Sequence, residues 1–184
     1  MAGQRVGAIA SLLATLAHAT TDGKCRALVL SGGANNGAWE TGVMWGLLHY
    51  GNPEDYAWDV VSGISAGAIN TGGIATWPTG TEYEMTEWLS NTWVTLLNSD
   101  VWARRTGSIY DLFMKEPSLL NDDPALQTLK DLTNQKGSIA RRFTVSAVDV
   151  NTGDFIAMNQ ENTVFEDLAQ ASLSSGSIPA VFQP

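Results

Sequence analysis

The chain has 184 residues and a mass of 19.7 kDa, and 44% of its residues are hydrophobic, so it can bury the core of one folded domain. Its 19 acidic and 10 basic residues give a formal net charge of -9. This balance excludes an extended basic surface for nucleic acid, and it also excludes attraction to anionic lipid through clustered Lys and Arg. Contact with a lipid surface would therefore rely on apolar and aromatic side chains.

The first residues have the layout of a secretory signal peptide. Arg5 precedes an apolar stretch over 6–16, which ends in the small-x-small cleavage pattern Ala17-His18-Ala19. We predict that residues 1–19 are removed, that the mature protein begins near Thr20, and that it is found in the secretory pathway or outside the cell. The alternative is a short amphipathic helix that the protein retains, and the protein would then be cytoplasmic.

The next segments alternate between strand and helix. Residues 25–30, CRALVL, and 58–61, WDVV, are apolar runs typical of buried strands. Each is followed by a glycine-containing turn and a helical pattern, over 37–51 and from 66 onwards. This order predicts the α/β class, as a three-layer α/β/α fold with a mainly parallel central sheet. Cys25 is the only cysteine, so we expect a small buried side chain beside the first strand.

Five further segments follow along the chain. Pro78 and a capping box, Thr81-x-x-Glu84, predict a helix with one core-facing stripe. Residues 141–150 form a β-rich run, 151–153 a turn, 154–159 a return strand, and 163–175 a last helical pattern. The stripe of the capped helix comprises Met85, Trp88, Leu89, Thr92, Trp93, Leu96 and Leu97.

The seven tryptophans and the paired arginines each have two interpretations. Trp77, Trp88, Trp93 and Trp102 could gather at a lipid interface, but core packing of the helical stripe is favoured. Trp39 and Trp45 are likewise expected to pack the first helix. The pairs Arg104-Arg105 and Arg141-Arg142 are expected to be solvated charges.

The stretch GISAG, residues 63–67, is a G-x-S-x-G sequence between a strand and a helix. This is the pattern of a nucleophile elbow, a strained turn that presents the serine oxygen at the edge of a sheet. Gly63 and Gly67 suit such a turn because side chains there would collide with the neighbouring strand and helix. A structural turn can have the same five residues, but the context favours Ser65 as a nucleophile.

That context is a second glycine-rich turn, SGGANNG over 31–37, which also joins a strand to a helix. Unshielded backbone N–H groups at a helix N-terminus can bind the oxyanion of acyl transfer, and each such donor contributes roughly 10²–10³ in rate. The turn lacks the G-x-G-x-x-G of a dinucleotide site and the GK[ST] of a phosphate loop. Nothing in the pattern requires a metal ion or a cofactor.

The base that activates Ser65 is not a histidine of an α/β-hydrolase triad. That triad needs a histidine after the serine, whereas His18 and His49 both precede it. The remaining mechanism pairs the serine directly with a carboxylate.

Three separated segments resemble the patatin-like phospholipase family. SGGANNGAW resembles its oxyanion loop, GISAG its nucleophile elbow, and SSGSIPAVFQP over 174–184 its segment of small residues, proline and phenylalanine. AVDVNTGDF over 147–155 also resembles a strand-turn of the family. The resemblance covers residues 26–184 as the N-terminal part of a patatin-like acyl hydrolase domain.

The resemblance implies a lipid acyl hydrolase of the phospholipase A or esterase type. It implies a Ser–Asp dyad with Ser65 as nucleophile, no cofactor, an acyl lipid as substrate, and transient contact with a lipid surface. Phospholipid, galactolipid and acylglycerol esters all present the same carbonyl group and all stay open as substrates. The implied oxyanion hole comprises Gly32, Gly33, Ala34 and Gly37.

Departures from the family pattern leave one alternative open. Ala34 replaces a third glycine, Asn36 replaces a basic residue, and the D-G-[GA] motif that carries the dyad aspartate does not occur in the sequence. We expect this aspartate beyond Pro184, and Asp149 and Asp154 are weaker candidates for its role. The alternative is a non-catalytic patatin-like domain that binds lipid or a protein partner.

Overall fold

The computed structural model describes residues 23–105 and 118–182. The predicted signal peptide over 1–19 lies outside the described residues, so the leader and the cellular location stay predictions. No described helix is both long and apolar enough to cross a bilayer.

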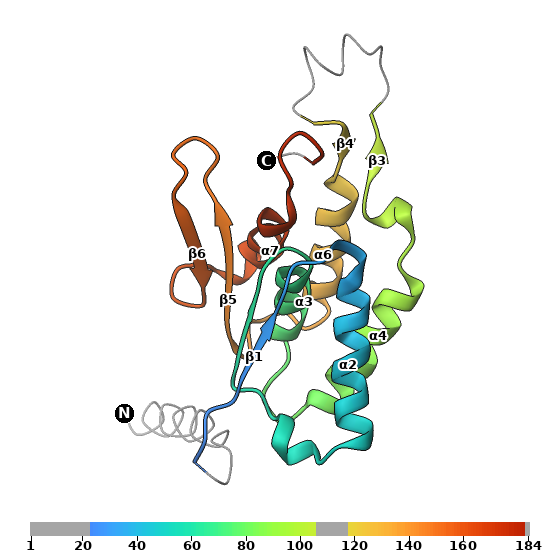
Figure 1. Ribbon diagram of the computed structural model, residues 1–184, viewed down its shortest axis with the longest axis vertical. Helices are drawn as coiled ribbons and strands as arrows, with labels where there is room; N and C mark the ends of the chain where they lie inside the picture. Colours follow the sequence, from blue (N-terminus) through green and yellow to red (C-terminus); the bar gives the residue numbers. More distant parts are fainter. Residues whose placement is uncertain (1–22, 106–117, 183–184) are drawn as a thin grey trace, which may run out of the picture.

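A four-stranded sheet lies along one side of a group of helices (Figure 1). The strands are β1 (Ala27–Leu30), β2 (Val60–Gly63), β5 (Arg142–Val148) and β6 (Phe155–Asn159), in the order β1-β2-β5-β6. β1, β2 and β5 are parallel, and β6 returns antiparallel to β5. The α/β class, the mainly parallel sheet and its three neighbouring parallel strands are thus confirmed.

Helices and short elements connect these strands. The α-helices are α2 (Gly37–Tyr50), α3 (Ala66–Ala75), α4 (Glu82–Thr95), α6 (Asp123–Asn134) and α7 (Leu168–Gly176). A small second sheet pairs β3 (Ala103–Arg104) with β4 (Leu120–Asn121). Single 3-10 turns are η1 (Ala34–Asn36), η2 (Pro53–Tyr56), η3 (Asn98–Asp100) and η4 (Phe165–Asp167).

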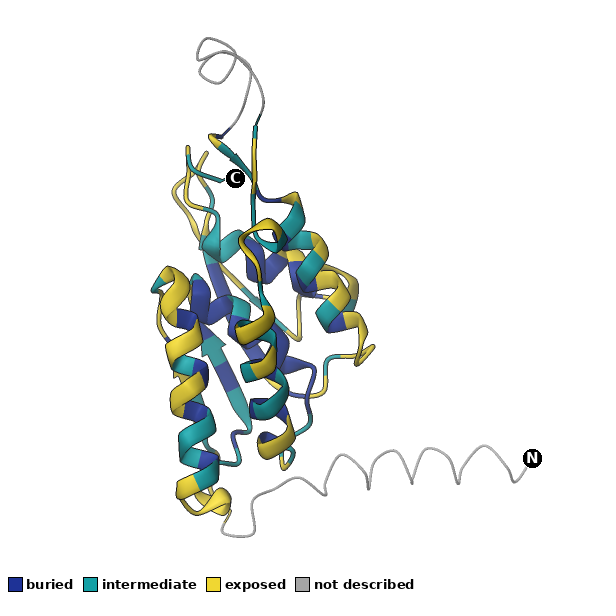
Figure 2. Cartoon of the chain, turned by 90° about the vertical axis from the view of Figure 1, so that its right-hand side faces the viewer, coloured by how far each residue is buried: buried dark blue, intermediate teal, exposed yellow. Residues whose placement is uncertain are grey.

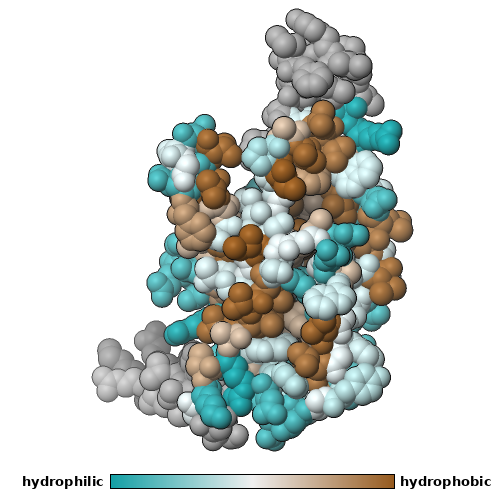
Figure 3. Space-filling view, viewed as in Figure 1, coloured by the Kyte–Doolittle hydropathy of each residue, from teal (hydrophilic) through white to brown (hydrophobic). Residues whose placement is uncertain are grey.

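The two faces of the sheet have different surroundings. Alternate residues of the parallel strands, including Leu30, Val61 and Val145, are buried in a core that α2, α3, α4 and α7 complete. On the opposite face Val29 is 76% and Phe155 68% exposed. Apolar surface gathers over β1 and the β5–β6 hairpin in Figure 3, and Figure 2 shows buried residues concentrated between the sheet and the helices. The described residues therefore form two of the three expected layers, namely the sheet and one layer of helices.

α4 begins where the sequence predicts it, directly after the N-cap residue Thr81, but the predicted capping box is not formed. The Thr81 hydroxyl donates to the carbonyl of Pro78 and accepts no amide of the helix. The capping-box prediction is therefore wrong, because a local turn bond takes up the Thr81 side chain. Leu97 lies beyond the helix end and is exposed, whereas Trp88 and Trp93 pack against the core as expected. Trp77 is also buried in the core.

Three further expectations about single residues are wrong. Cys25 is exposed, because it precedes β1 and lies outside the core. Trp39 is exposed as well, because it projects from the side of α2 that faces solvent. Arg141 is buried in an ion pair with Glu82, at 3.0 Å, whereas its neighbour Arg142 is exposed.

Candidate active site

Ser65 lies at the carboxyl end of β2, in the single turn that leads into α3. Its backbone φ of 56° is in the left-handed region, which non-glycine residues rarely adopt and which stores strain of about 1–2 kcal/mol. Two backbone bonds hold the turn: Ile64 donates to Leu30, and Gly67 donates back to Ile64. The Ser65 amide also donates to the Ser175 hydroxyl of α7, at 2.8 Å.

Both glycines of the turn are required by close approach. A Cβ atom on Gly63 would collide with the carbonyl oxygen of Gly67. A Cβ atom on Gly67 would lie 2.6 Å from the carbonyl oxygen of Leu30 in β1. These clashes are with backbone atoms, so no side-chain rotation relieves them. The turn can therefore pack between β1 and α3 only without side chains at these two positions.

The glycine-rich turn after β1 lies directly against Ser65. A Cβ atom on Gly32 would be 3.2 Å from the Ser65 Cβ and 3.8 Å from its Oγ. Ala34, in the place of the third glycine, has a φ of 50° and so adopts a conformation that glycine would favour. Within residues 23–105 and 118–182, the amides of Gly33 and Ala34 donate to no protein acceptor.

Gly37 has a different position in the same loop. Its amide already donates to the carbonyls of Ala34 and Asn35, and a Cβ atom there would lie 2.7 Å from the Trp93 ring. The geometry therefore makes Gly37 a point of close packing between α2 and α4. Among the described residues, the amides of Gly32, Gly33 and Ala34 have no protein acceptor, so these N–H groups are open to an oxyanion.

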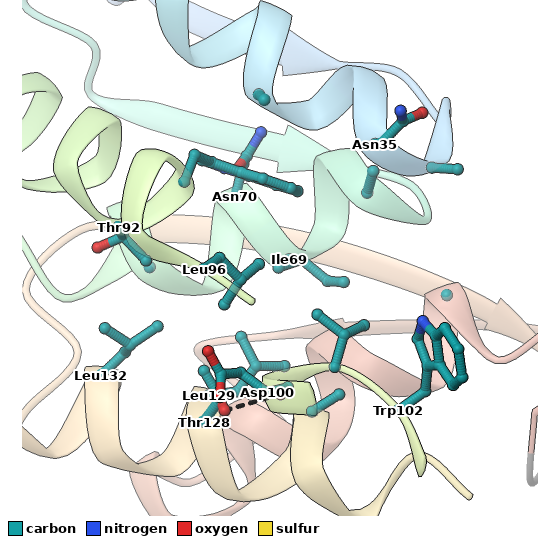
Figure 4. Close-up of a pocket in the computed structure, with 18 of the residues that line it drawn as sticks. Asn35, Ile69, Asn70, Thr92, Leu96, Asp100, Trp102, Thr128, Leu129 and Leu132 are labelled. Atoms are coloured by element: carbon teal, nitrogen blue, oxygen red, sulfur yellow. Dashed lines mark hydrogen bonds between the residues drawn. The ribbon is translucent and has the colours of Figure 1, made fainter. Parts of the chain in front are cut away.

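An apolar cavity of about 590 Å³ extends from Ser65 between α3, α4 and α6 (Figure 4). In Figure 4, Ile69 and Asn70 of α3 lie on one side, and Thr128, Leu129 and Leu132 of α6 on the other. Trp88 and Trp93 of α4 also line it, as do Ala34 and Ser65. The cavity thus places an apolar space beside the serine and the glycine-rich loop.

The other candidate groups in the sequence are held elsewhere. His49 lies at the far end of α2 from the glycine-rich loop, stacked on Trp45, with its Nε2 2.9 Å from Glu87. Asp149 accepts the amides of Asn151 and Thr152, so its carboxylate shapes the hairpin turn.

Asp154 belongs to the same hairpin, where its amide donates to the Thr152 hydroxyl. No group of three or more His, Cys, Asp or Glu side chains in the described parts of the chain could hold a metal ion.

Three polar residues at this site were not identified from the sequence: Ser175, Glu40 and Asn70. Asn70 is fully buried, and its side chain binds Gly37, Glu40 and Trp93. A signal for it was available, because Asn70 is the one amide side chain within the run AGAINTGGIA of α3. Ser175 had no such signal, because its partner is a backbone amide 110 residues away.

The fold and the site define an α/β protein with a strained serine turn beside a glycine-rich loop. The chain belongs to the patatin-like phospholipase family, whose model, described as "Patatin-like phospholipase", matches residues 28–184. No curated protein sequence matches the chain significantly.

Two solved structures are similar to this chain. The crystal structure of the type III effector protein ExoU has a TM-score of 0.53 and 14% identity, over 86% of this chain and 39% of that one. The heterodimeric ExoU–SpcU complex from the type III secretion system of Pseudomonas aeruginosa has a TM-score of 0.49 and 21% identity, over 85% of this chain and 37% of that one. The chain thus spans 39% of the length of ExoU. Its similarity to the ExoU crystal structure shows that the two share a fold.

Proposed function

We propose that the protein is a lipid acyl hydrolase in which Ser65 attacks a fatty acyl ester. The observation that carries this proposal is that Ser65 lines the apolar cavity together with Ala34, and that the glycine-rich loop lies against the serine. The cavity suits a hydrocarbon chain, and the loop suits the negative charge that develops on the ester oxygen. Membership of the patatin-like phospholipase family supports the same chemistry.

The proposed reaction has two steps. Ser65 Oγ bonds to the carbonyl carbon while its proton passes to a carboxylate, and the amides of Gly33 and Ala34 hold the oxyanion. The C–O bond to the alcohol then breaks, and the alcohol leaves with that proton. Water attacks the acyl-Ser65 ester in the second step, which releases the fatty acid and returns the serine.

We propose that the carboxylate is an aspartate in a D-G-[GA] segment that follows Pro184, as the family pattern implies. The geometry of the hairpin supports this choice over Asp149, because that carboxylate already accepts two backbone amides. Replacing Asp149 by Asn would therefore have little effect on turnover.

The test is hydrolysis of p-nitrophenyl acyl esters by the full-length protein and its Ser65→Ala variant. Turnover should fall by several orders of magnitude in the variant, because a covalent mechanism cannot proceed without its nucleophile. A fluorophosphonate probe should label the wild-type protein at Ser65, which mass spectrometry of the labelled peptide would locate. Asp149→Asn is the matched control and should retain both activities.

One result would favour a binding protein instead. A folded full-length protein that neither hydrolyses these esters nor takes up the probe would contradict the enzyme. If that protein still binds acyl lipid, it would be a non-catalytic lipid-binding domain. The departures from the family pattern at Ala34 and Asn36 would then account for its lack of activity.

A further inference from the structure

A buried hydrogen-bond network lies behind the glycine-rich loop. The Asn70 side chain is fully buried in α3, and its Nδ2 donates to the carbonyl of Gly37 at 3.0 Å and to Glu40 Oε2 at 3.1 Å. Its Oδ1 accepts from the indole Nε1 of Trp93 at 2.8 Å. One side chain thus joins α2, α3 and α4 directly beneath the loop.

The indole determines which way the Asn70 amide points. Because the Trp93 Nε1–H can only donate, the atom that faces it must be the amide oxygen. The amide nitrogen is therefore directed at Gly37 and Glu40, both of which can only accept through the atoms involved. Every polar atom of the Asn70 side chain has a partner of the required kind.

The same network reaches both ends of the loop. Glu40 accepts the backbone amide of Ser31 at 2.8 Å, and its other carboxylate oxygen accepts from Asn70. Ser31 begins the turn and Gly37 ends it. The free amides of Gly33 and Ala34 lie between these two attachment points. A small shift at either end would move the two donors relative to Ser65.

We propose that Asn70 is a positioning residue that, with Glu40, holds the glycine-rich loop in the geometry that binds the oxyanion. This inference rests on the proposed function, because it concerns the rate of the acyl transfer that Ser65 would perform. Preorganised donors contribute most when they need no rearrangement during the reaction. Asn70 should therefore affect kcat and leave the binding of the acyl chain in the cavity largely unchanged.

Asn70→Asp in the full-length protein tests this inference. The new carboxylate would turn an acceptor toward the Gly37 carbonyl and the Glu40 carboxylate, both of which are acceptors themselves. We expect kcat on a p-nitrophenyl acyl ester to fall about 10²-fold, because small misplacements of catalytic groups have effects of this size, and KM to change less than about threefold. The matched control is Asn91→Asp on the exposed side of α4, which should change neither value.

A second substitution should restore the broken contact. Adding Glu40→Gln to Asn70→Asp places an amide nitrogen opposite the new carboxylate, while the amide oxygen of the introduced side chain still accepts from Ser31. We expect the double variant to recover at least about tenfold in kcat over Asn70→Asp. Glu40→Gln alone should lower kcat, because it loses the hydrogen bond from Asn70.

The outcomes separate the two proposals. If Ser65→Ala retains wild-type turnover, the proposed function fails. If Ser65→Ala is inactive but Asn70→Asp keeps the wild-type kcat, only the positioning role of Asn70 fails. If circular dichroism shows that Asn70→Asp does not fold, the Trp93→Phe variant tests the positioning role instead. This substitution keeps an aromatic ring in the wall of the cavity but removes the indole N–H that donates to Asn70. We then expect a fall in kcat of about tenfold, and an unchanged kcat would overturn the positioning role.

Discussion

Ser65 and Ala34 both have left-handed backbone conformations, and the glycine-rich loop brings them to the same site. Strain of this kind persists only where surrounding bonds hold it, and it concentrates at functional sites. For Ser65 the bond from its amide to the Ser175 hydroxyl connects the turn to α7. Ser175 therefore stabilises the conformation that presents the serine oxygen to the cavity.

Ser175→Ala should lower the free energy of unfolding by about 1–2 kcal/mol, because it leaves the Ser65 amide without its acceptor. Urea denaturation followed by circular dichroism measures this change. Ser174→Ala is the matched control, because the Ser174 hydroxyl binds only the carbonyl of Gln170 in its own helix. Equal stabilities for the two variants would show that the Ser175 bond does not stabilise the turn.

α3 connects the serine turn to the helices on the buried face of the sheet, and small residues make its close contacts possible. A Cβ atom on Gly72 would collide with the Ser172 hydroxyl of α7, and one on Gly73 would lie 3.2 Å from the Trp88 ring of α4. Close approach of this kind explains why the run AGAINTGGIA forms a buried helix although glycine disfavours helices. Packing against two helices outweighs the intrinsic preference of the chain.

Gly72→Ala should therefore destabilise the protein by about 1–3 kcal/mol through overpacking against Ser172. Adding Ser172→Ala removes the hydroxyl in the way and should recover part of this loss. Gly42→Ala is the control on exposed helix surface, where a Cβ atom meets nothing within 4 Å, and it should stabilise by up to about 1 kcal/mol. The melting temperatures of these three variants and of the wild-type protein measure the changes. A Gly72→Ala variant more stable than the wild type would contradict the proposed packing.

Arg141 joins several segments of the molecule at the end of the sheet opposite the serine. Its guanidinium donates to the carbonyls of Trp58, Trp77 and Pro78, each at 2.9 Å, and pairs with Glu82. Burial lowers the pKa of Arg141, while the charge of Glu82 acts in the opposite direction. One side chain thus connects four segments: the approach to β2, the end of α3, the start of α4 and the start of β5.

Arg141→Met should lower the free energy of unfolding by about 3–5 kcal/mol, because Glu82 would be left buried without its partner. Esterase kcat measured well below the melting temperature should stay at the wild-type value, since the change lies at the other end of β2 from Ser65. Arg142→Met replaces the exposed neighbour and should leave the melting temperature nearly unchanged. If both variants melted alike, the buried pair would not contribute to stability.

Local sequence patterns predicted several of the elements, whereas α6 and the β3–β4 pair were not predicted. Apolar runs and the glycine turns after them predicted β1, β2, α2 and α3, because these signals lie within a few neighbouring residues. β1 and β2 are parallel, so their carboxyl ends lie at one edge of the sheet, and the glycine-rich loop and the G-x-S-x-G turn that follow them lie together.

Only the tertiary structure decided which side chains serve the site and which positions are buried. Asn70 and Ser175 act on segments 33 and 110 residues away, and no local pattern encodes such contacts. Arg141 and Arg142 are adjacent in the sequence, yet one is buried in an ion pair and the other is exposed. The reason is the same in each case: the environment of a polar side chain is set by the elements that pack around it, and these come together only when the whole chain folds.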